Sequence, residues 1–356
     1  MKLLFLLFFF PVIAFASPMM KLPWQWYSDP NIMSSDLERN FTKLPLEGHI
    51  QDDQRFWSGD YWALNRGNIN YRWHSPQPAG FRLRSPTIEE AKFMSTEQLS
   101  YLSPSEKYDL YTGNYTYPLR QEVEKIANRR AESWEGICHG WAPSTMNHKE
   151  PTAKTLVNAD GISIPFGSSD IKALLAYYYA DGFESPTHQM GWRCYTDDYY
   201  ENYEEYCEDD LNAGAFHMVI ANKIALRNEG VIVDIMRGAQ VWNHPIVSYS
   251  SRVIKYKNRA HDSAPGTVRR AKIETYAKVV LTTRNSWLPV KGTPDQKETS
   301  KKYVYWLDLD KDNNILGGEW KSDDRPDFLW VKYKPATFEG TLSRLPELLN
   351  DDPAQP

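Results

Sequence analysis

The sequence is short of cysteine, of net charge and of long apolar runs. Only three of its 356 residues are cysteine, and the formal net charge is a mild −5. Such a charge offers no basic surface for nucleic acid, so no nucleic-acid partner is expected. Beyond the first 16 residues no stretch is apolar enough to cross a bilayer, and we predict no membrane span. No internal repeat or low-complexity linker is present.

The N-terminus has the pattern of a signal peptide. Met1-Lys2 supplies a positive charge, residues 3–15 are apolar, and Ala14-Phe15-Ala16 fits a cleavage site. The run is too short to span a bilayer. We therefore predict a signal peptide over 1–16 and a secreted or periplasmic mature protein.

The cysteines divide into a pair and a single residue. Cys194 and Cys207 lie close together in a polar, tyrosine-rich segment, so in an oxidising compartment they would most simply form a disulfide. Cys138 is then a free thiol in the segment Ser133–Ser144. It is either a buried, inert cysteine or a nucleophile, and the remainder of the chain must decide between the two.

Local patterns predict helices in the first half of the chain. Thr87 with Glu90, and Ser103 with Glu106, form reciprocal capping patterns at helix starts. Ser169 is expected to cap a further helix. The predicted helices are 88–94, 104–110, 118–130, one that begins at Cys138, and 170–178. The segment before residue 86 is rich in aromatic residues and loops.

The second half is predicted to form strands. Residues 216–221 and 230–235 are expected to pair as a hairpin, followed by strands at 270–283 and 303–309. Helices followed by an antiparallel sheet indicate an α+β fold. The expected division is the signal peptide (1–16), an N-terminal loop-rich and helical region (17–130) and a catalytic core (131–356).

This order suggests a catalytic set of Cys138, His217 and Asp234. A thiol nucleophile needs an imidazole to take its proton, and the imidazole needs an acceptor on its other nitrogen. A helix start should lower the pKa of Cys138 further. His217 and Asp234 would lie on the two strands of the predicted hairpin, and Asp234 within an apolar strand would require a partner.

Other residues compete for these roles. His217 could be a core histidine that only donates a hydrogen bond. His139 adjoins Cys138, but neighbouring helix residues point about 100° apart, which makes it a poor base. His244 lies in Trp242-Asn243-His244-Pro245, where Asn243 is an alternative residue for orienting the base.

At these residues the chain resembles the oomycete cell-wall transglutaminase elicitors and their bacterial relatives. The resemblance rests on motifs spread over nearly the whole mature chain: Cys138-His139-Gly140-Trp141-Ala142-Pro143, Phe216-His217, Val233-Asp234, Val241-Trp242-Asn243-His244-Pro245, 102–109, 57–62 and 317–320. It implies a papain-like or transglutaminase-like core, with an aromatic-rich N-terminal extension, and a Cys-His-Asp set at Cys138, His217 and Asp234.

The expected activity is therefore that of a protein-glutamine γ-glutamyltransferase. Its expected substrates are proteins that supply a glutamine and a lysine or another primary amine, and no cofactor or metal is expected. The alternatives are a papain-like cysteine protease and a secreted glycan- or peptide-binding protein with a vestigial triad. Residues 308–319 also match a calcium-loop template in part, but a polar hairpin turn is the expected structure there.

Overall fold

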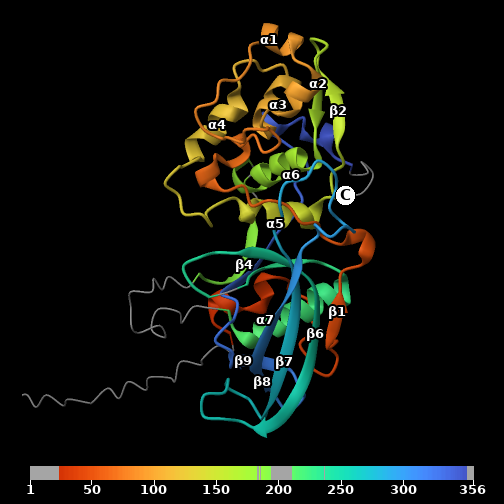
Figure 1. The fold of residues 1–356 in the computed structure, drawn as a ribbon. Helices are drawn as coiled ribbons and strands as arrows, with labels where there is room; N and C mark the ends of the chain where they lie inside the picture. Colours follow the sequence, from red (N-terminus) through yellow and green to blue (C-terminus); the bar gives the residue numbers. More distant parts are fainter. Residues whose placement is uncertain (1–23, 183, 185, 194–210, 236, 351–356) are drawn as a thin grey trace, which may run out of the picture.

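The computed structural model describes residues 24–182, 184, 186–193, 211–235 and 237–350. One end of the molecule is helical and the other is built on a sheet, with helices α5 (Cys138–Asn147) and α6 (Ser168–Tyr177) between them (Figure 1). The described chain thus combines helices with an antiparallel sheet, as predicted. The predicted signal peptide and both Cys194 and Cys207 lie outside the described residues.

The helical end contains four short helices and a two-stranded hairpin. They are α1 (Ile88–Phe93), α2 (Thr96–Ser100), α3 (Pro104–Tyr111), α4 (Pro118–Ile126), β2 (Lys154–Val157) and β3 (Ser163–Phe166). Capping boxes at Thr87 and at Ser103 confirm the two predicted helix starts. The prediction for α6 was wrong in detail, because Gly167 is its N-cap and the Asp170 carboxylate accepts the Gly167 N–H.

The other end is organised around an eight-stranded antiparallel sheet. Seven strands follow the order β4-β10-β5-β6-β7-β8-β9, and β1 (Glu47–His49) pairs with β6. The bounds are β4 (Thr187–Gly191), β5 (Val231–Asp234), β6 (Asn243–Asn258), β7 (Arg269–Val280), β8 (Glu298–Leu309), β9 (Ile315–Trp320) and β10 (Phe328–Lys332). Strands β7 and β8 contain the predicted strands at 270–283 and 303–309 almost completely.

The segment that carries His217 is helical, which corrects the strand predicted there. Helix α7 (Ala213–Ile220) begins at Asn212, whose side chain accepts the N–H groups of Gly214 and Ala215. A π-helical segment, η7 (Ala221–Leu226), continues it. The residues of α7 are buried throughout, so its amphipathic period is weak, and an apolar run of this length reads equally well as a strand.

Short helical turns complete the described chain. The 3₁₀ turns are η1 (Trp26–Ser28), η2 (Pro30–Ile32), η3 (Asp52–Gln54), η4 (Leu64–Arg66), η5 (Asn68–Asn70), η8 (Gly340–Leu342) and η9 (Leu345–Leu348), and the π-helical segment η6 (Tyr178–Gly182) extends α6. Within the described residues, no helix has the length and apolar character needed to cross a membrane.

The calcium-template segment is a hairpin turn between β8 and β9. The Asp310 carboxylate accepts the backbone N–H groups of Asp312 and Asn314. The carboxylates of Asp308 and Glu319 instead each lie 2.7 Å from the buried Arg270 guanidinium. Arg270 therefore draws two of the template carboxylates away from the turn. Across the described parts of the chain, no cluster of three His, Cys, Asp or Glu side chains is placed to hold a metal ion.

Candidate active site

Cys138 is the first residue of α5, as predicted, and α5 is held close to its neighbour. Ile137, the residue before Cys138, donates its backbone N–H to the Tyr61 carbonyl. At Gly140 a Cβ atom would collide with the carbonyl of Ala176 and the side chain of Ala180. The glycine of the Cys138-His139-Gly140 motif thus permits the close approach of α5 to α6, which fixes the position of the thiol.

The thiol of Cys138 points towards the start of β6. Its Sγ lies 3.8 Å from the Val241 carbonyl oxygen and 3.6 Å from the Asn243 side-chain Nδ2. The thiol can donate to the carbonyl, and the amide can donate to the sulfur. Cys138 is only 7% exposed, so these groups form its immediate polar surroundings.

A tryptophan fixes the orientation of the Asn243 amide. Trp330 of β10 donates its Nε1–H to Asn243 Oδ1 at 2.8 Å. Because an indole N–H can only donate, Oδ1 must face Trp330, and Nδ2 must face Cys138. The Asn243 amide is therefore a positioned hydrogen-bond donor for the sulfur.

Asp234 lies on the strand beside Asn243. The two residues are register partners of β5 and β6, and Asp234 Oδ1 accepts the Trp242 backbone N–H at 2.9 Å. The negative charge of Asp234 raises the pKa of the Cys138 thiol. The structure thus brings two of the three sequence-predicted catalytic residues, Cys138 and Asp234, into one site, together with Asn243, which the sequence analysis named as the alternative orienting residue.

His217 lies in a different environment. Its Nδ1 hydrogen-bonds with the Tyr305 hydroxyl at 2.8 Å, and its ring packs against Phe41 and Tyr305. Nε2 is buried, and no described residue hydrogen-bonds to it. Neither Cys138 nor Asp234 takes part in these contacts. The hairpin that was expected to align His217 with Asp234 is absent, because residues 213–226 are helical.

Two other histidines lie closer in sequence to the groups around the thiol. His244 follows Asn243, packs edge-to-face on Trp141 of α5, and donates Nδ1–H to the Val280 carbonyl at 2.7 Å. That bond leaves Nε2 as the nitrogen that accepts protons. His139 lines a pocket together with Asn243.

The ionisation of these groups is governed by burial. Desolvation raises the pKa of the Cys138 thiol, and hydrogen bonds from Asn243 and from the His139 backbone oppose it only in part. The start of α5 does lower this pKa through the His139 backbone N–H, as predicted, but desolvation outweighs that contribution and the net shift is upward. Desolvation also lowers the pKa of His217 and of His244 to about 4. The resting site accordingly holds a neutral thiol and the neutral imidazole of His244.

A pocket of about 330 Å³ adjoins the Asn243 side of the thiol. Its lining comes from α5, η6, β4, β6 and β10: His139, Tyr179, Ala180, Thr187, Gln189, Asn243, Phe328, Trp330 and Lys332. The lysine at its edge, Lys332, donates to the Tyr179 carbonyl at 2.6 Å. Gln189, Trp330 and Lys332 could not be identified from the sequence, because single polar or aromatic residues in apolar strands have no distinctive spacing.

Comparison with known proteins agrees with this architecture. The chain is similar to the GP42 transglutaminase from Phytophthora sojae, whose crystal structure superimposes with a TM-score of 0.65 at 21% sequence identity, over 89% of this chain and 94% of that one. This likeness shows a shared fold. Among curated proteins no match is found. The sequence model of the transglutaminase elicitor family matches residues 30–343. The chain therefore belongs to the transglutaminase elicitor family.

Proposed function

We propose that the protein is a cysteine-dependent protein-glutamine γ-glutamyltransferase with Cys138 as its nucleophile. The observation that carries the proposal is the thiol at the start of α5, beside an amide donor whose orientation Trp330 fixes. The adjoining pocket can receive a side chain. Family membership and the fold shared with a transglutaminase support the choice of acyl transfer.

The proposed reaction has two balanced steps. The sulfur of Cys138 attacks the γ-carboxamide carbon of a glutamine, the carbon–nitrogen bond breaks, and the thiol proton leaves with ammonia through the base. A lysine amine then attacks the thioester carbon, the carbon–sulfur bond breaks as the isopeptide bond forms, and the amine proton returns to the sulfur through the base. Because the resting thiol is neutral, proton transfer accompanies the attack on the carboxamide.

The Asn243 amide supplies a positioned dipole for both steps. Its Nδ2 stabilises negative charge on the sulfur as the proton leaves, and a preorganised donor costs no reorganisation at that moment. In the proposed set Cys138, His217 and Asp234, the carboxylate of Asp234 would compensate positive charge that develops on the base. We also propose a papain-like core. The signal-peptide pattern at the N-terminus supports a place of action outside the cytoplasm.

The identity of the base is a separate question with two candidates. His217 is the sequence-based candidate, but its contacts are with Tyr305 and Phe41. His244 is favoured by its position next to Asn243, its packing on Trp141 and the fixed tautomer described above. His217→Gln and His244→Gln should be compared in kcat on one glutaminyl peptide. The base is the histidine whose loss reduces kcat by roughly 10²–10⁴-fold and flattens the acidic limb of the pH profile.

The activity itself is tested with a glutaminyl peptide and a labelled primary amine. The expected result is release of ammonia and incorporation of the amine at the glutamine, without new N-termini. Backbone cleavage without glutamine modification would assign the site to a protease. Peptide binding without any covalent product would indicate a binding protein.

A further inference from the structure

The acceptor half of the proposed reaction has two protons to move. At neutral pH a lysine side chain arrives as an ammonium, because its ordinary pKa is about 10.4. It must lose one proton before its nitrogen has a lone pair with which to attack, and another as the isopeptide bond forms. One of the two ends on the sulfur of Cys138, so the other must leave the site for water. A basic group that faces both the incoming amine and the solvent can carry it.

His139 lines the pocket on the Asn243 side of the thiol. It directly follows Cys138 at the start of α5, and successive residues of a helix point about 100° apart. That angle makes His139 a poor base for the thiol, but it also directs the ring into the neighbouring pocket. The residue is exposed to solvent, and within the described parts of the chain no group hydrogen-bonds to its ring. His139 is therefore open to a ligand.

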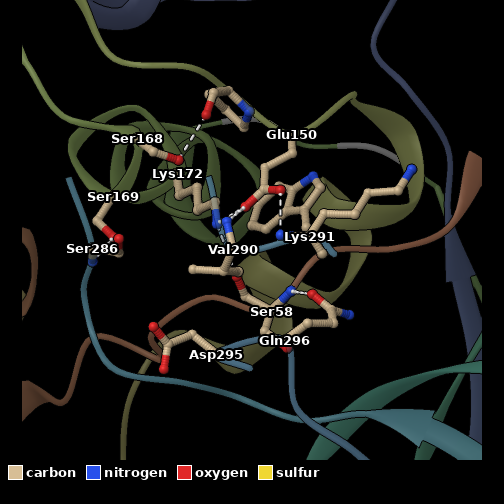
Figure 2. Close-up of polar contacts among 12 residues, drawn as sticks. Ser58, Glu150, Ser168, Ser169, Lys172, Ser286, Val290, Lys291, Asp295 and Gln296 are labelled. Atoms are coloured by element: carbon tan, nitrogen blue, oxygen red, sulfur yellow. Dashed lines mark hydrogen bonds and ion pairs between the residues drawn. The ribbon is translucent and has the colours of Figure 1, made fainter. Parts of the chain in front are cut away.

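Other basic side chains with a lowered pKa are already bound by the protein. The Nζ of Lys172 lies 2.5 Å from the Glu150 carboxylate and also donates to a backbone carbonyl (Figure 2). The Nζ of Lys107 lies 2.7 Å from the Asp170 carboxylate. These lysines hold the fold together, whereas the ring of His139 can exchange a proton with a bound molecule.

The surroundings of His139 keep its imidazole neutral at pH 7. Partial loss of hydration in the pocket lowers the pKa of His139, which Asp181 opposes and Lys332 reinforces. Asp181 belongs to η6, which touches α5 where Gly140 meets Ala180. The Asp181 carboxylate is exposed, and no hydrogen bond or ion pair joins it to a described residue. A neutral imidazole can accept a proton, and this carboxylate stabilises the imidazolium that results.

The pocket favours the uncharged form of an amine. Its walls include the apolar side chains of Ala180, Phe328 and Trp330, which match the methylene chain of a lysine. The ammonium of Lys332 lies at its edge, where it donates to the Tyr179 carbonyl at 2.6 Å. Desolvation and a neighbouring cation both lower the pKa of an amine, so an ammonium that enters the pocket releases its proton more readily.

The pocket connects the edge of the sheet with the surroundings of the thiol. Strand β4 ends the sheet on this side, and its Thr187 and Gln189 line the pocket. Thr187 is exposed. The lining continues across β10 to Asn243 of β6, whose amide lies 3.6 Å from the Cys138 sulfur. An unbranched side chain can therefore approach the thiol from the edge of the sheet.

We propose that this pocket receives the acyl-acceptor amine and that His139 takes the proton that its ammonium loses before the attack. The proposal rests on the transglutaminase function proposed above and assigns the acceptor half of that reaction. The ammonium N–H bond breaks as the proton joins the imidazole, and the imidazolium then releases this proton to water. The neutral amine attacks the thioester carbon, and its second proton goes to the sulfur of Cys138.

The test compares two small acceptor amines of similar shape at pH 7. Propylamine is an ammonium at this pH, like lysine, whereas trifluoroethylamine is uncharged. For wild type and His139→Gln, kcat/KM is measured for incorporation of each amine into one glutaminyl peptide at saturating concentration. The substitution should lower kcat/KM for propylamine by about 100-fold, the range of a lost general base. The loss for trifluoroethylamine should be at least about tenfold smaller, because that amine has no surplus proton to give up.

A matched variant and a change of pH serve as controls. His261→Gln removes an exposed histidine that does not line the pocket, and it should retain the wild-type ratio of the two kcat/KM values. Raising the pH towards the pKa of propylamine should narrow the deficit of His139→Gln, because more of the amine then arrives uncharged.

Equal losses for the two amines in His139→Gln, or no loss for propylamine, would overturn the role of His139. In both cases the wild type still incorporates amines, so the proposed function survives. If the wild type incorporates neither amine and releases no ammonia from the peptide, the proposed function itself is wrong.

Discussion

The buried imidazole of His217 should make the protein lose stability as the pH falls. Its side chain is fully buried, and desolvation lowers its pKa from 6.5 to about 4. Between these values the unfolded chain binds a proton that the folded protein excludes, so the contribution is complete above pH 6.5 and is lost as the pH falls to 4. At about 1.4 kcal/mol per pKa unit, crossing the whole window costs about 3 kcal/mol, of which about 2 kcal/mol is lost by pH 4.5.

The pH dependence of the wild type alone does not isolate this effect. Burial raises the pKa of Asp109 to about 7, and a raised carboxyl pKa stabilises the folded state as the pH falls. Burial lowers the pKa of His244 to about 4, which acts in the same direction as His217. A variant that lacks only one titrating group removes these shared contributions from the comparison.

His217→Gln is the appropriate variant, because a glutamine can still hydrogen-bond to the Tyr305 hydroxyl without titrating. Urea unfolding at pH 7 and at pH 4.5 gives the loss of stability for each protein. The loss should be about 2 kcal/mol smaller in His217→Gln than in the wild type. The exposed His261→Gln serves as the control and should follow the wild type. Equal losses in His217→Gln and the wild type would refute the placement of His217 in a dry interior.

Three further predictions concern the supports of the site. Gly140→Ala should lower the free energy of unfolding, measured by urea denaturation, by about 1–3 kcal/mol or more, because the added methyl group collides with Ala176 in α6. Unchanged stability would contradict the close contact of α5 with α6. Trp330→Phe should lower the kcat of the folded protein by about tenfold or more, because the Asn243 amide loses the donor that orients it. Trp26→Phe, at an exposed tryptophan, is the control, and unaltered kcat in Trp330→Phe would show that the amide orientation is immaterial. Lys107→Met should lower the free energy of unfolding by about 3–5 kcal/mol in the same assay, because Lys107 and Asp170 form a fully buried ion pair and the substitution leaves Asp170 without its cation. Lys92→Met, at a half-exposed lysine, is the control. A smaller loss in Lys107→Met than in Lys92→Met would contradict the prediction.

Patterns confined to neighbouring residues predicted the local structure well. Thr87 and Ser103 are capping residues because their partners lie three positions away in the chain, so the sequence alone contains the whole motif. The helix start at Cys138 was also predicted from the residues around it, and α5 begins there. By contrast, residues 216–221 are buried on all sides and, His217 apart, apolar, and a fully buried helix has no polar face to reveal its period. The strand prediction there, and the alignment of His217 built on it, failed for this reason.

The surroundings of the thiol depend on contacts distant in the sequence. Asn243 and Trp330 come within hydrogen-bonding distance because β6 and β10 lie on the two sides of the short strand β5. Local sequence patterns do not encode this strand order. The pKa of Cys138 likewise depends on how completely other segments cover it. A helix start lowers a thiol pKa, but here desolvation exceeds that effect. Sequence reasoning could therefore propose the nucleophile and could not predict its ionisation.

The most direct test of the account is to trap the acyl-enzyme at Cys138. A glutaminyl peptide is mixed with the protein in the absence of an amine, the reaction is quenched in acid, and the intact and proteolysed protein are weighed by mass spectrometry. If Cys138 is the nucleophile, the fragment that contains it should carry an adduct of the peptide mass minus ammonia, which added amine removes and which is absent in Cys138→Ala. Glutamine modification that persists in Cys138→Ala, or an adduct confined to another residue, would contradict it.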